Sequence, residues 1–328
     1  MPPPVPTRDL HTDLGDLRLE RGCTLEGDTV RARLYGDSGP LVVVLGGISA
    51  DRFVADNPGK AGRHAHGWWG PLVRPGGAVD LSRVRVLGLD FAPDADQSCP
   101  ETITTRDQAM RLAKLLAAHG LTADGVIGSS YGGMVALALA QYHPGSVRRL
   151  CIVSAAHRPF SIGVAWRGIQ RRVVRLGLAA GDAEAGLKLA RELAMTTYRT
   201  PEEFADRFTL SETASASPEQ GARFDICDYL ESRGNAFAAR MDAARFLALS
   251  ESIDLHRVTP EAIHQPTRLV TATSDQLAPL QDMRELRDRL GGPAELFTLT
   301  SLYGHDAFLK EWDALEVALG GWIKEVER

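Results

Sequence analysis

The sequence predicts an α/β fold, because strands of the buried type alternate with helical patterns along most of the chain. LVVVLGG, residues 41–47, is a continuous aliphatic run that ends in glycines, as is typical of a strand covered on both faces. TRDQAMRLAKLLAAHG, residues 105–120, spaces its apolar residues along one helix face and stops at a glycine. Together they indicate a mainly parallel sheet with helices on both faces.

The other expected elements continue this alternation on both sides of a long helical segment. Before that segment the sequence predicts a strand at 83–91, a strand around 126–127, a helix at 132–142 and a strand at 149–156. After it, the sequence predicts a strand at 267–274, a helix at 281–290, a strand at 295–301 and a last helix at 313–327.

The segment between these two blocks, residues 157–264, has a different composition. It is rich in Arg, Ala, Glu and Asp, has few β-branched runs, and shows helical periodicity. We interpret it as a helical lid inserted into a core made of residues 1–156 and 265–328. Such a block typically covers the end of the sheet where the carboxyl ends of the strands meet, which is also where ligands bind.

The composition narrows the functional classes. A formal net charge of −5 over 328 residues gives no reason to expect nucleic acid as a partner. No run of 18 apolar residues exists, and the start MPPPVPTRDL has no apolar segment, so we expect neither a membrane span nor a secretory signal. The four scattered cysteines lack CxxC spacing, which favours reduced thiols in a cytoplasmic protein.

The stretch VIGSSYGGMVALALA, residues 126–140, contains a G-x-S-x-G pattern centred on Ser130. Centring the pattern on Ser129 would need glycines at 127 and 131, which the chain does not have. A phosphate-binding loop would need a lysine after the glycines, and a dinucleotide fingerprint would need G-x-G-x-x-G, so neither is predicted. A plain structural turn is the alternative, but the pattern lies between a β-like run and a helix of small residues. This placement favours a serine on a sharp strand-to-helix turn, where the nucleophile of an α/β-hydrolase fold lies.

A serine hydroxyl needs a base and an orienting carboxylate before it becomes a useful nucleophile. Asp275 follows one predicted strand and His305 follows the next, so loops present both at the same edge of the sheet. The chain order Ser130, Asp275, His305 is the order of this architecture. We expect Asp275 to fix the imidazole tautomer and His305 to take and return the proton.

The negative charge that develops on a carbonyl oxygen under attack needs two backbone N–H donors. Tyr131, directly after the nucleophile, is expected to supply one. Ile48, in the loop after the first aliphatic strand, is expected to supply the other. No metal site is predicted, since His64 and His66 in GRHAHGWW have no third ligand at a convincing spacing.

Several stretches resemble the homoserine O-acyltransferases of the α/β-hydrolase fold, from about residue 40 to the C-terminus. They are GWWGPLV, TTRDQ, GSSYGGMVALALA, LAMTTYRTPEEFADRF, DYLESRGNAFAARMDAARFLALSESID and YGHDAFL. The resemblance implies transfer of an acyl group from acyl-CoA to an amino-acid hydroxyl through an acyl-Ser130 intermediate, as a step of methionine biosynthesis. It also implies that Arg199 holds the carboxylate of the amino acid and Asp306 holds its ammonium group.

The resemblance bears on the donor as well. PFSIGVAWRGIQRR, residues 159–172, is similar to the segment of succinyl-transferring members, which favours succinyl-CoA over acetyl-CoA. Arg167, Arg52 and Arg63 are the candidates to pair with a succinyl carboxylate. Tyr131 replaces a methionine that is usual in the family, and we expect its side chain to border the acyl pocket.

The resemblance further implies a homodimer assembled through the helical insertion, with acyl-CoA as a co-substrate and no permanently bound cofactor. Three alternatives stay open at this point. In the first alternative, the chain transfers acetyl rather than succinyl groups, or uses serine as the acceptor. In the second, it is a serine esterase or other hydrolase with the same triad. In the third, it is a catalytically inactive relative that binds a ligand.

Overall fold

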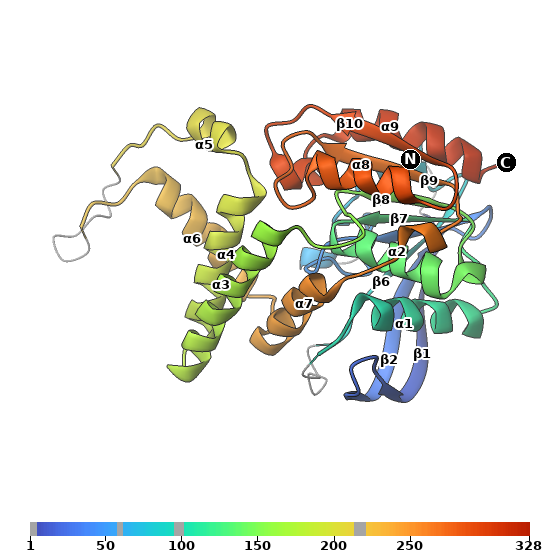
Figure 1. Ribbon diagram of the computed structural model, residues 1–328, viewed down its shortest axis with the longest axis horizontal. Coiled ribbons are helices and arrows are strands. Elements are labelled where there is room, and N and C mark those ends of the chain that lie inside the picture. The colour runs from blue at the N-terminus through green and yellow to red at the C-terminus, as the bar shows by residue number, and fades with distance from the viewer. Residues whose placement is uncertain (1–4, 58–61, 95–101, 213–220) are drawn as a thin grey trace.

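The computed structural model describes the chain except for residues 1–4, 58–61, 95–101 and 213–220 (Figure 1). Its strands are β1 (Thr7–Arg18), β2 (Thr24–Tyr35), β3 (Leu41–Leu45), β4 (Val73–Arg74), β5 (Val79–Asp80), β6 (Arg85–Leu89), β7 (Gly125–Ser129), β8 (Leu150–Val153), β9 (Thr267–Ala272) and β10 (Ala294–Leu299). Its α-helices are α1 (Thr105–Ala118), α2 (Tyr131–Tyr142), α3 (Ser161–Ala179), α4 (Ala183–Tyr198), α5 (Pro201–Arg207), α6 (Asp225–Ala238), α7 (Ala243–Leu255), α8 (Leu280–Arg289) and α9 (Trp312–Val326). A short 3-10 helix, η4 (Gly304–Leu309), precedes α9.

Within the described residues, eight strands form one sheet in the order β1-β2-β6-β3-β7-β8-β9-β10. From β6 to β10 all neighbours are parallel, whereas β2 pairs antiparallel with both β1 and β6. The predicted α/β class with a mainly parallel sheet is therefore confirmed. Because the parallel strands run the same way, the loops after β3, β7, β9 and β10 emerge at one edge of the sheet.

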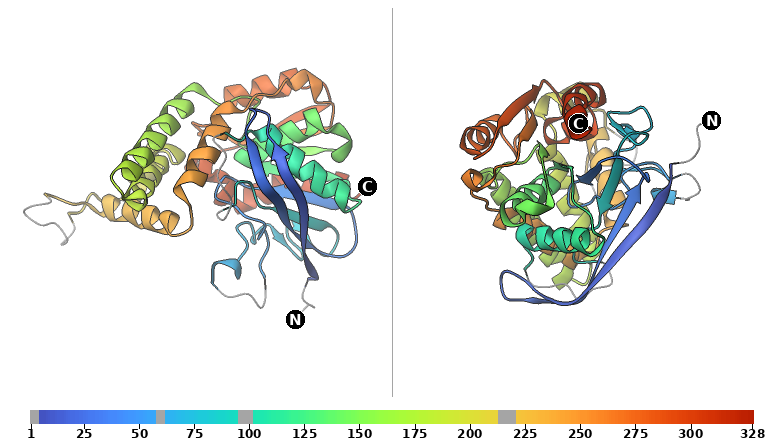
Figure 2. Two further views of the ribbon diagram at one scale, coloured as in Figure 1. Left: turned by 90° about the horizontal axis from the view of Figure 1, so that it is seen from below. Right: turned by 90° about the vertical axis from the view of Figure 1, so that its right-hand side faces the viewer.

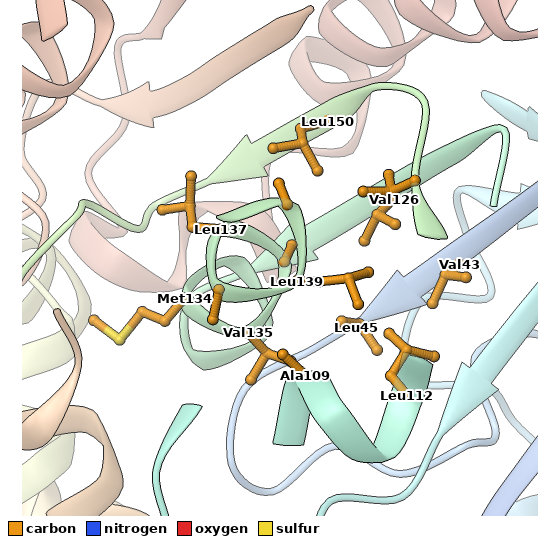
Figure 3. Close-up of a cluster of buried hydrophobic side chains, with 14 of the residues drawn as sticks. Val43, Leu45, Ala109, Leu112, Val126, Met134, Val135, Leu137, Leu139 and Leu150 are labelled. Carbon is orange, nitrogen blue, oxygen red and sulfur yellow. The ribbon is translucent and has the colours of Figure 1, made fainter. Parts of the chain in front are cut away.

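Helices cover both faces of this sheet. On one face, side chains of α1, α2 and α8 pack on the strands, and on the other face α9 does so. Figure 3 shows Leu137 and Leu139 of α2 in the cluster that includes Val43 and Leu45 of β3 and Val126 of β7. Each fully buried aliphatic side chain of this kind contributes roughly 1.5–3 kcal/mol relative to an exposed one.

The central strand β3 shows why its sequence has no polar alternation. All five residues of Leu41–Leu45 are buried. Val43 faces the cluster under α1 and α2, while Val42 and Val44 join the cluster under α9. A strand covered on both faces needs apolar side chains at every position, as its sequence predicted.

The sequence pattern does not predict the long antiparallel pair β1 and β2 at one edge of the sheet, which Figure 2 shows as two extended ribbons. Only Leu10 and Leu17 of β1 are buried, and most of its other side chains are exposed and polar. The register also shifts on both sides of Gly15. A polar edge strand with an irregular register lacks the clean alternation that marks a strand in a sequence.

Within the described residues, five α-helices, α3 to α7, lie between β8 and β9, where the sequence predicted a helical segment. Figures 1 and 2 show α3, α4 and α6 standing beside the sheet, with α7 next to it. Their buried apolar side chains, among them Val174, Leu187 and Phe237, form a small core of their own. Ile48, from the loop after β3, packs against that core.

Two expectations from composition concern membranes and thiols. Among the helices that the structure describes, none is long and apolar enough to cross a membrane. Cys23, Cys151 and Cys227 are free thiols, and Cys99 lies outside the described residues.

Candidate active site

Ser130 lies at the turn between β7 and α2, with φ 53° and ψ −120°, a region that L-residues rarely adopt. The two glycines of the motif are needed for packing. A Cβ on Gly128 would lie 2.4 Å from the carbonyl oxygen of Gly132, and a Cβ on Gly132 would lie 2.4 Å from that of Leu45. The glycines therefore let the turn pack closely enough to present Ser130 at the start of α2.

A chain of hydrogen bonds runs from Ser130 to Asp275. The Ser130 Oγ lies 2.8 Å from Nε2 of His305, and Nδ1 of His305 lies 2.9 Å from Oδ2 of Asp275. The Asp275 side chain is fully buried, and its Oδ1 also accepts the backbone N–H groups of Leu277 and Ala278. The turn after β7 and the loops after β9 and β10 thus bring together the three residues predicted from the sequence, in the geometry of a nucleophile, a base and its orienter.

The surroundings of His305 favour its protonated form. Burial alone would lower the pKa of His305, but the charge and the hydrogen bond of Asp275, with a smaller contribution from Asp306, outweigh it. The pKa of His305 is therefore raised above its ordinary value of 6.5. An imidazole with this environment is a stronger base for the proton of Ser130.

The two residues predicted to supply the oxyanion donors belong to segments close to the nucleophile. Tyr131 is the first residue of α2, directly after Ser130, and Ile48 lines the pocket into which Ser130 opens. The backbone N–H of Gly132 donates to the carbonyl of Gly46 at 2.9 Å, which ties the loop after β3 to the start of α2. This contact keeps the segment that carries Ile48 beside the nucleophile.

The side chain of Tyr131 does not border the pocket, so that expectation was wrong. It is 1% exposed and extends into the core, where its ring meets Phe91 edge-on with centroids 4.9 Å apart. Ser130 points its side chain into the pocket, and the next residue of the turn points behind it. A single-residue step at a helix start is enough to reverse the direction of a side chain.

The pocket beside Ser130 encloses about 100 Å³ and lies between the sheet edge and the inserted helices. Trp166 and Gln170 of α3 and Arg191 of α4 line it, and the sequence did not single them out. Arg191 lies over the rings of Tyr198 and Phe237, 5.3 Å from each centroid. Helical spacing was an available signal, since Arg191 precedes Tyr198 by seven residues and so shares its helix face.

Of the two arginines with described side chains that were considered for a succinyl carboxylate, Arg167 lines this pocket. Its Nε donates to Oδ1 of Asp254 at 2.6 Å. Arg52 instead lines a separate cleft and pairs with Asp90, so its assignment to the acyl pocket was wrong. The Arg63 side chain lies outside the described residues.

Arg199 and Asp306, the two predicted substrate-binding residues, are in direct contact. Nε of Arg199 donates to Oδ2 of Asp306 at 2.9 Å, and its Nη1 donates to Glu203 at 2.8 Å. Asp306 follows His305 in η4 and lines the catalytic pocket, whereas Arg199 lines a surface pocket behind it. The structure thus places an anion on the pocket wall and a cation immediately behind that anion.

His64 and His66 lie apart from these residues. The ring of His64 is tilted against that of Phe53 with centroids 4.2 Å apart, and Nδ1 of His66 lies 3.7 Å from Oδ1 of Asp56. The described part of the chain contains no group of three or more His, Cys, Asp or Glu side chains placed to hold a metal ion. We derive no metal chemistry from either histidine.

Comparisons with known proteins give one family. A family model described as alpha/beta hydrolase fold matches residues 41–311. A homoserine O-succinyltransferase of Xanthomonas campestris pv. campestris is 42% identical over 295 residues, covering 88% of this chain and 77% of that protein. A homoserine O-acetyltransferase of Mycobacterium marinum is 31% identical over 341 residues, covering 92% and 90%. The crystal structure of esterase E22 superposes with a TM-score of 0.86 and 20% identity, over 97% of this chain and all of that one, which shows the fold alone.

Proposed function

Since this chain belongs to the homoserine O-acyltransferase family of the α/β-hydrolase fold, we propose that it transfers a succinyl group from succinyl-CoA to the hydroxyl of L-homoserine. The product, O-succinylhomoserine, is an intermediate of methionine biosynthesis. The observation that carries the proposal is the Ser130–His305–Asp275 relay opening into a pocket whose wall includes Asp306.

In the first half-reaction Ser130 Oγ attacks the thioester carbonyl of acyl-CoA while His305 Nε2 takes its proton. The N–H groups of Ile48 and Tyr131 stabilise the oxyanion, and losing one such donor typically costs about 3 kcal/mol. His305 then gives the proton to the departing thiolate, so that coenzyme A leaves and an ester remains on Ser130. Asp275 stabilises the imidazolium throughout.

In the second half-reaction His305 removes the proton from the hydroxyl of the amino acid, whose oxygen attacks the ester on Ser130. The collapse of this second oxyanion returns the proton to Ser130 and releases the O-acyl amino acid. Asp306 and His305 both line the pocket, so an ammonium group held by Asp306 would lie in the same cavity as the base. Arg199, which contacts Asp306 from behind the pocket wall, is the proposed cation for the carboxylate of the same zwitterion.

Replacing Arg199 with alanine is expected to raise the KM for homoserine about tenfold or more, because a charged hydrogen-bond partner of the carboxylate is lost. Burst kinetics of coenzyme A release should show acylation of Ser130 within about twofold of wild type. Arg199→Lys keeps the charge, so its KM for homoserine should lie between those of the wild type and Arg199→Ala. Arg207→Ala is the matched control, since Arg207 also contacts Glu203 but is 43% exposed. An unchanged homoserine KM in Arg199→Ala would rule out this role.

Arg167 supports the succinyl donor over the acetyl donor. Within the described residues its only hydrogen bond is from Nε, so Nη1 and Nη2 are available to a carboxylate in the pocket. A Cβ on Gly163 would lie 3.1 Å from Nη1, which means that the guanidinium group lies over this glycine. The bidentate fork of an arginine suits a terminal carboxylate.

Arg167→Gln is expected to lower kcat/KM for succinyl-CoA about 10- to 100-fold, the cost of one charge-assisted hydrogen bond or more. The same ratio for acetyl-CoA should change less than about threefold. Initial rates of coenzyme A release measure both. Arg172→Gln is the control, because Arg172 is exposed on the same helix and does not line the pocket. Equal losses with the two donors would contradict the assignment of Arg167.

One experiment separates the proposed transferase from its alternatives. Wild-type enzyme is given succinyl-CoA or acetyl-CoA, each with homoserine, serine or no acceptor, and the products are identified by mass spectrometry. We expect O-succinylhomoserine as the main product and slow hydrolysis without an acceptor. Coenzyme A release that is equally fast without an acceptor would make the protein a hydrolase, which is the second candidate because the same relay serves water.

We also propose that residues 157–264 act as a lid over the core formed by 1–156 and 265–328, and that the lid mediates a cytoplasmic homodimer. Support comes from exposed apolar side chains on two of its helices. They are Ile162, Ile169, Leu176 and Leu178 on α3 and Leu189 on α4. Sedimentation of the full chain measures the assembly state, and a monomer at micromolar concentration would exclude the dimer.

A further inference from the structure

Tyr131, the residue directly after the nucleophile, contacts helix α7 through its side chain. Its Oη lies 2.8 Å from Oγ of Ser252, and both residues are almost fully buried, at 1% and 0% exposure. Burial raises the pKa of Tyr131, so the phenol stays protonated. A hydrogen bond between neutral groups in a dry environment fixes the ring firmly, because neither group has water as an alternative partner.

Arg245, near the start of α7, connects the same helix to the loop that carries Ile48. Its guanidinium donates to three backbone carbonyls, those of Pro93 at 2.8 Å, Phe91 at 3.0 Å and Ile48 at 3.4 Å. One side chain therefore ties the loop after β3 to the loop after β6. The contact to the carbonyl of Ile48 is the longest of the three, and Ile48 is one of the residues that line the pocket.

We propose that α7 positions both oxyanion donors, through Ser252 on Tyr131 and through Arg245 on the loop of Ile48. The proposal rests on Ser130 as the nucleophile, and it is independent of which acyl group or acceptor the enzyme uses. Tyr131 begins α2 and Ile48 lies in the loop after β3, so a support shared by both segments adds to the Gly132–Gly46 contact in keeping their N–H groups aimed at one point. Helix α7 contacts both of them in the described structure.

The positions of the N–H donors affect the rate of catalysis. An oxyanion hole works because its N–H groups are already in place when the charge develops, and a displacement of about 1 Å in an active site can cost on the order of 10²-fold in rate. Ser252 and Arg245 touch neither the substrate nor the reacting atoms. They are positioning residues that act through Tyr131 and Ile48.

Labelling of Ser130 by a fluorophosphonate tests the proposal directly. This probe needs the nucleophile, the base and the oxyanion donors, but no binding site for coenzyme A or homoserine. Tyr131→Phe and Ser252→Ala are each expected to label about tenfold more slowly. This decrease in rate is smaller than that expected for removal of a whole oxyanion donor, because the N–H group is displaced and not lost. The double variant should be no slower than the slower single variant, because both changes remove the same hydrogen bond. In acyl transfer kcat should fall in parallel, with an unchanged homoserine KM.

Two further variants keep the result interpretable. Tyr142→Phe removes a phenol from the far end of the same helix α2 and should label at the wild-type rate. Arg245→Lys should label more slowly than wild type, since one ammonium group cannot reach three carbonyls at once. Labelling within twofold of wild type in Tyr131→Phe, Ser252→Ala and Arg245→Lys, with lower melting temperatures, would show a purely structural role and overturn the proposal. Normal labelling of the wild type without transfer to homoserine would instead refute the proposed function alone.

Discussion

Ser130→Ala is expected to lower kcat by several orders of magnitude, on the order of 10⁶, because the variant cannot form the acyl-enzyme. The methyl group fits the turn, so the fold should be retained, and the thermal midpoint of unfolding checks this. The residual rate, measured as coenzyme A release from succinyl-CoA with homoserine, then reflects binding and the oxyanion donors alone.

Ser129→Ala is the matched control for this prediction. Ser129 is the neighbouring serine, fully buried, and its Oγ has no hydrogen-bond partner in the described residues. Removing that hydroxyl should leave kcat within about twofold of wild type. A loss of less than tenfold in Ser130→Ala, or a large loss in Ser129→Ala, would contradict the choice of Ser130 as the nucleophile.

Asp275→Asn is expected to lower kcat by about 10⁴-fold with little change in structure. The carboxylate accepts the Nδ1 proton of His305 at 2.9 Å, which leaves Nε2 free to accept the proton of Ser130. An amide at this position can donate to Nδ1 instead, and the imidazole would then carry its proton on the wrong nitrogen. A loss of less than about 100-fold would mean that Asp275 does not set the tautomer.

Asp275→Asn is also expected to shift the pH profile of activity in a defined direction. His305 must be neutral to act as the base, and its raised pKa places the acidic limb of kcat/KM above pH 6.5. Activity should therefore rise with pH through that midpoint in the wild type. In Asp275→Asn the charge that raises the pKa of His305 is lost, while the burial that lowers this pKa remains. The midpoint of the acidic limb should therefore move to lower pH. A midpoint that stays in place in a profile of kcat/KM against pH would contradict the pairing.

The catalytic relay was predictable because each member carries a local signal. Ser130 has its two flanking glycines, and Asp275 and His305 each follow a strand whose aliphatic run is visible in the sequence. Parallel strands deliver their carboxyl ends to one edge of a sheet, so the order of elements alone brings the three residues together. The local sequence patterns and the topology of the sheet both place the three catalytic residues at the same edge.

Other parts depend on tertiary contacts that no local pattern contains. Arg52 and Arg167 look alike in the sequence, yet Asp90 holds the first in a separate cleft. The side-chain direction of Tyr131 depends on a partner, Ser252, that lies 121 positions further along the chain. The contact between Arg199 and Asp306 likewise joins residues 107 positions apart. Sequence reasoning named the two arginines, Tyr131, Arg199 and Asp306, but not the partners Asp90 and Ser252, and the mutual geometry of all of them required the fold.

The central claim is that Ser130 carries the acyl group between coenzyme A and homoserine. Mass spectrometry of the enzyme mixed with succinyl-CoA, followed by digestion, tests this claim most directly. We expect one succinyl group on the peptide that contains Ser130, and its disappearance on addition of homoserine with the appearance of O-succinylhomoserine. No acylated Ser130 peptide, or an adduct that is lost as free succinate at the same rate with and without homoserine, would contradict it.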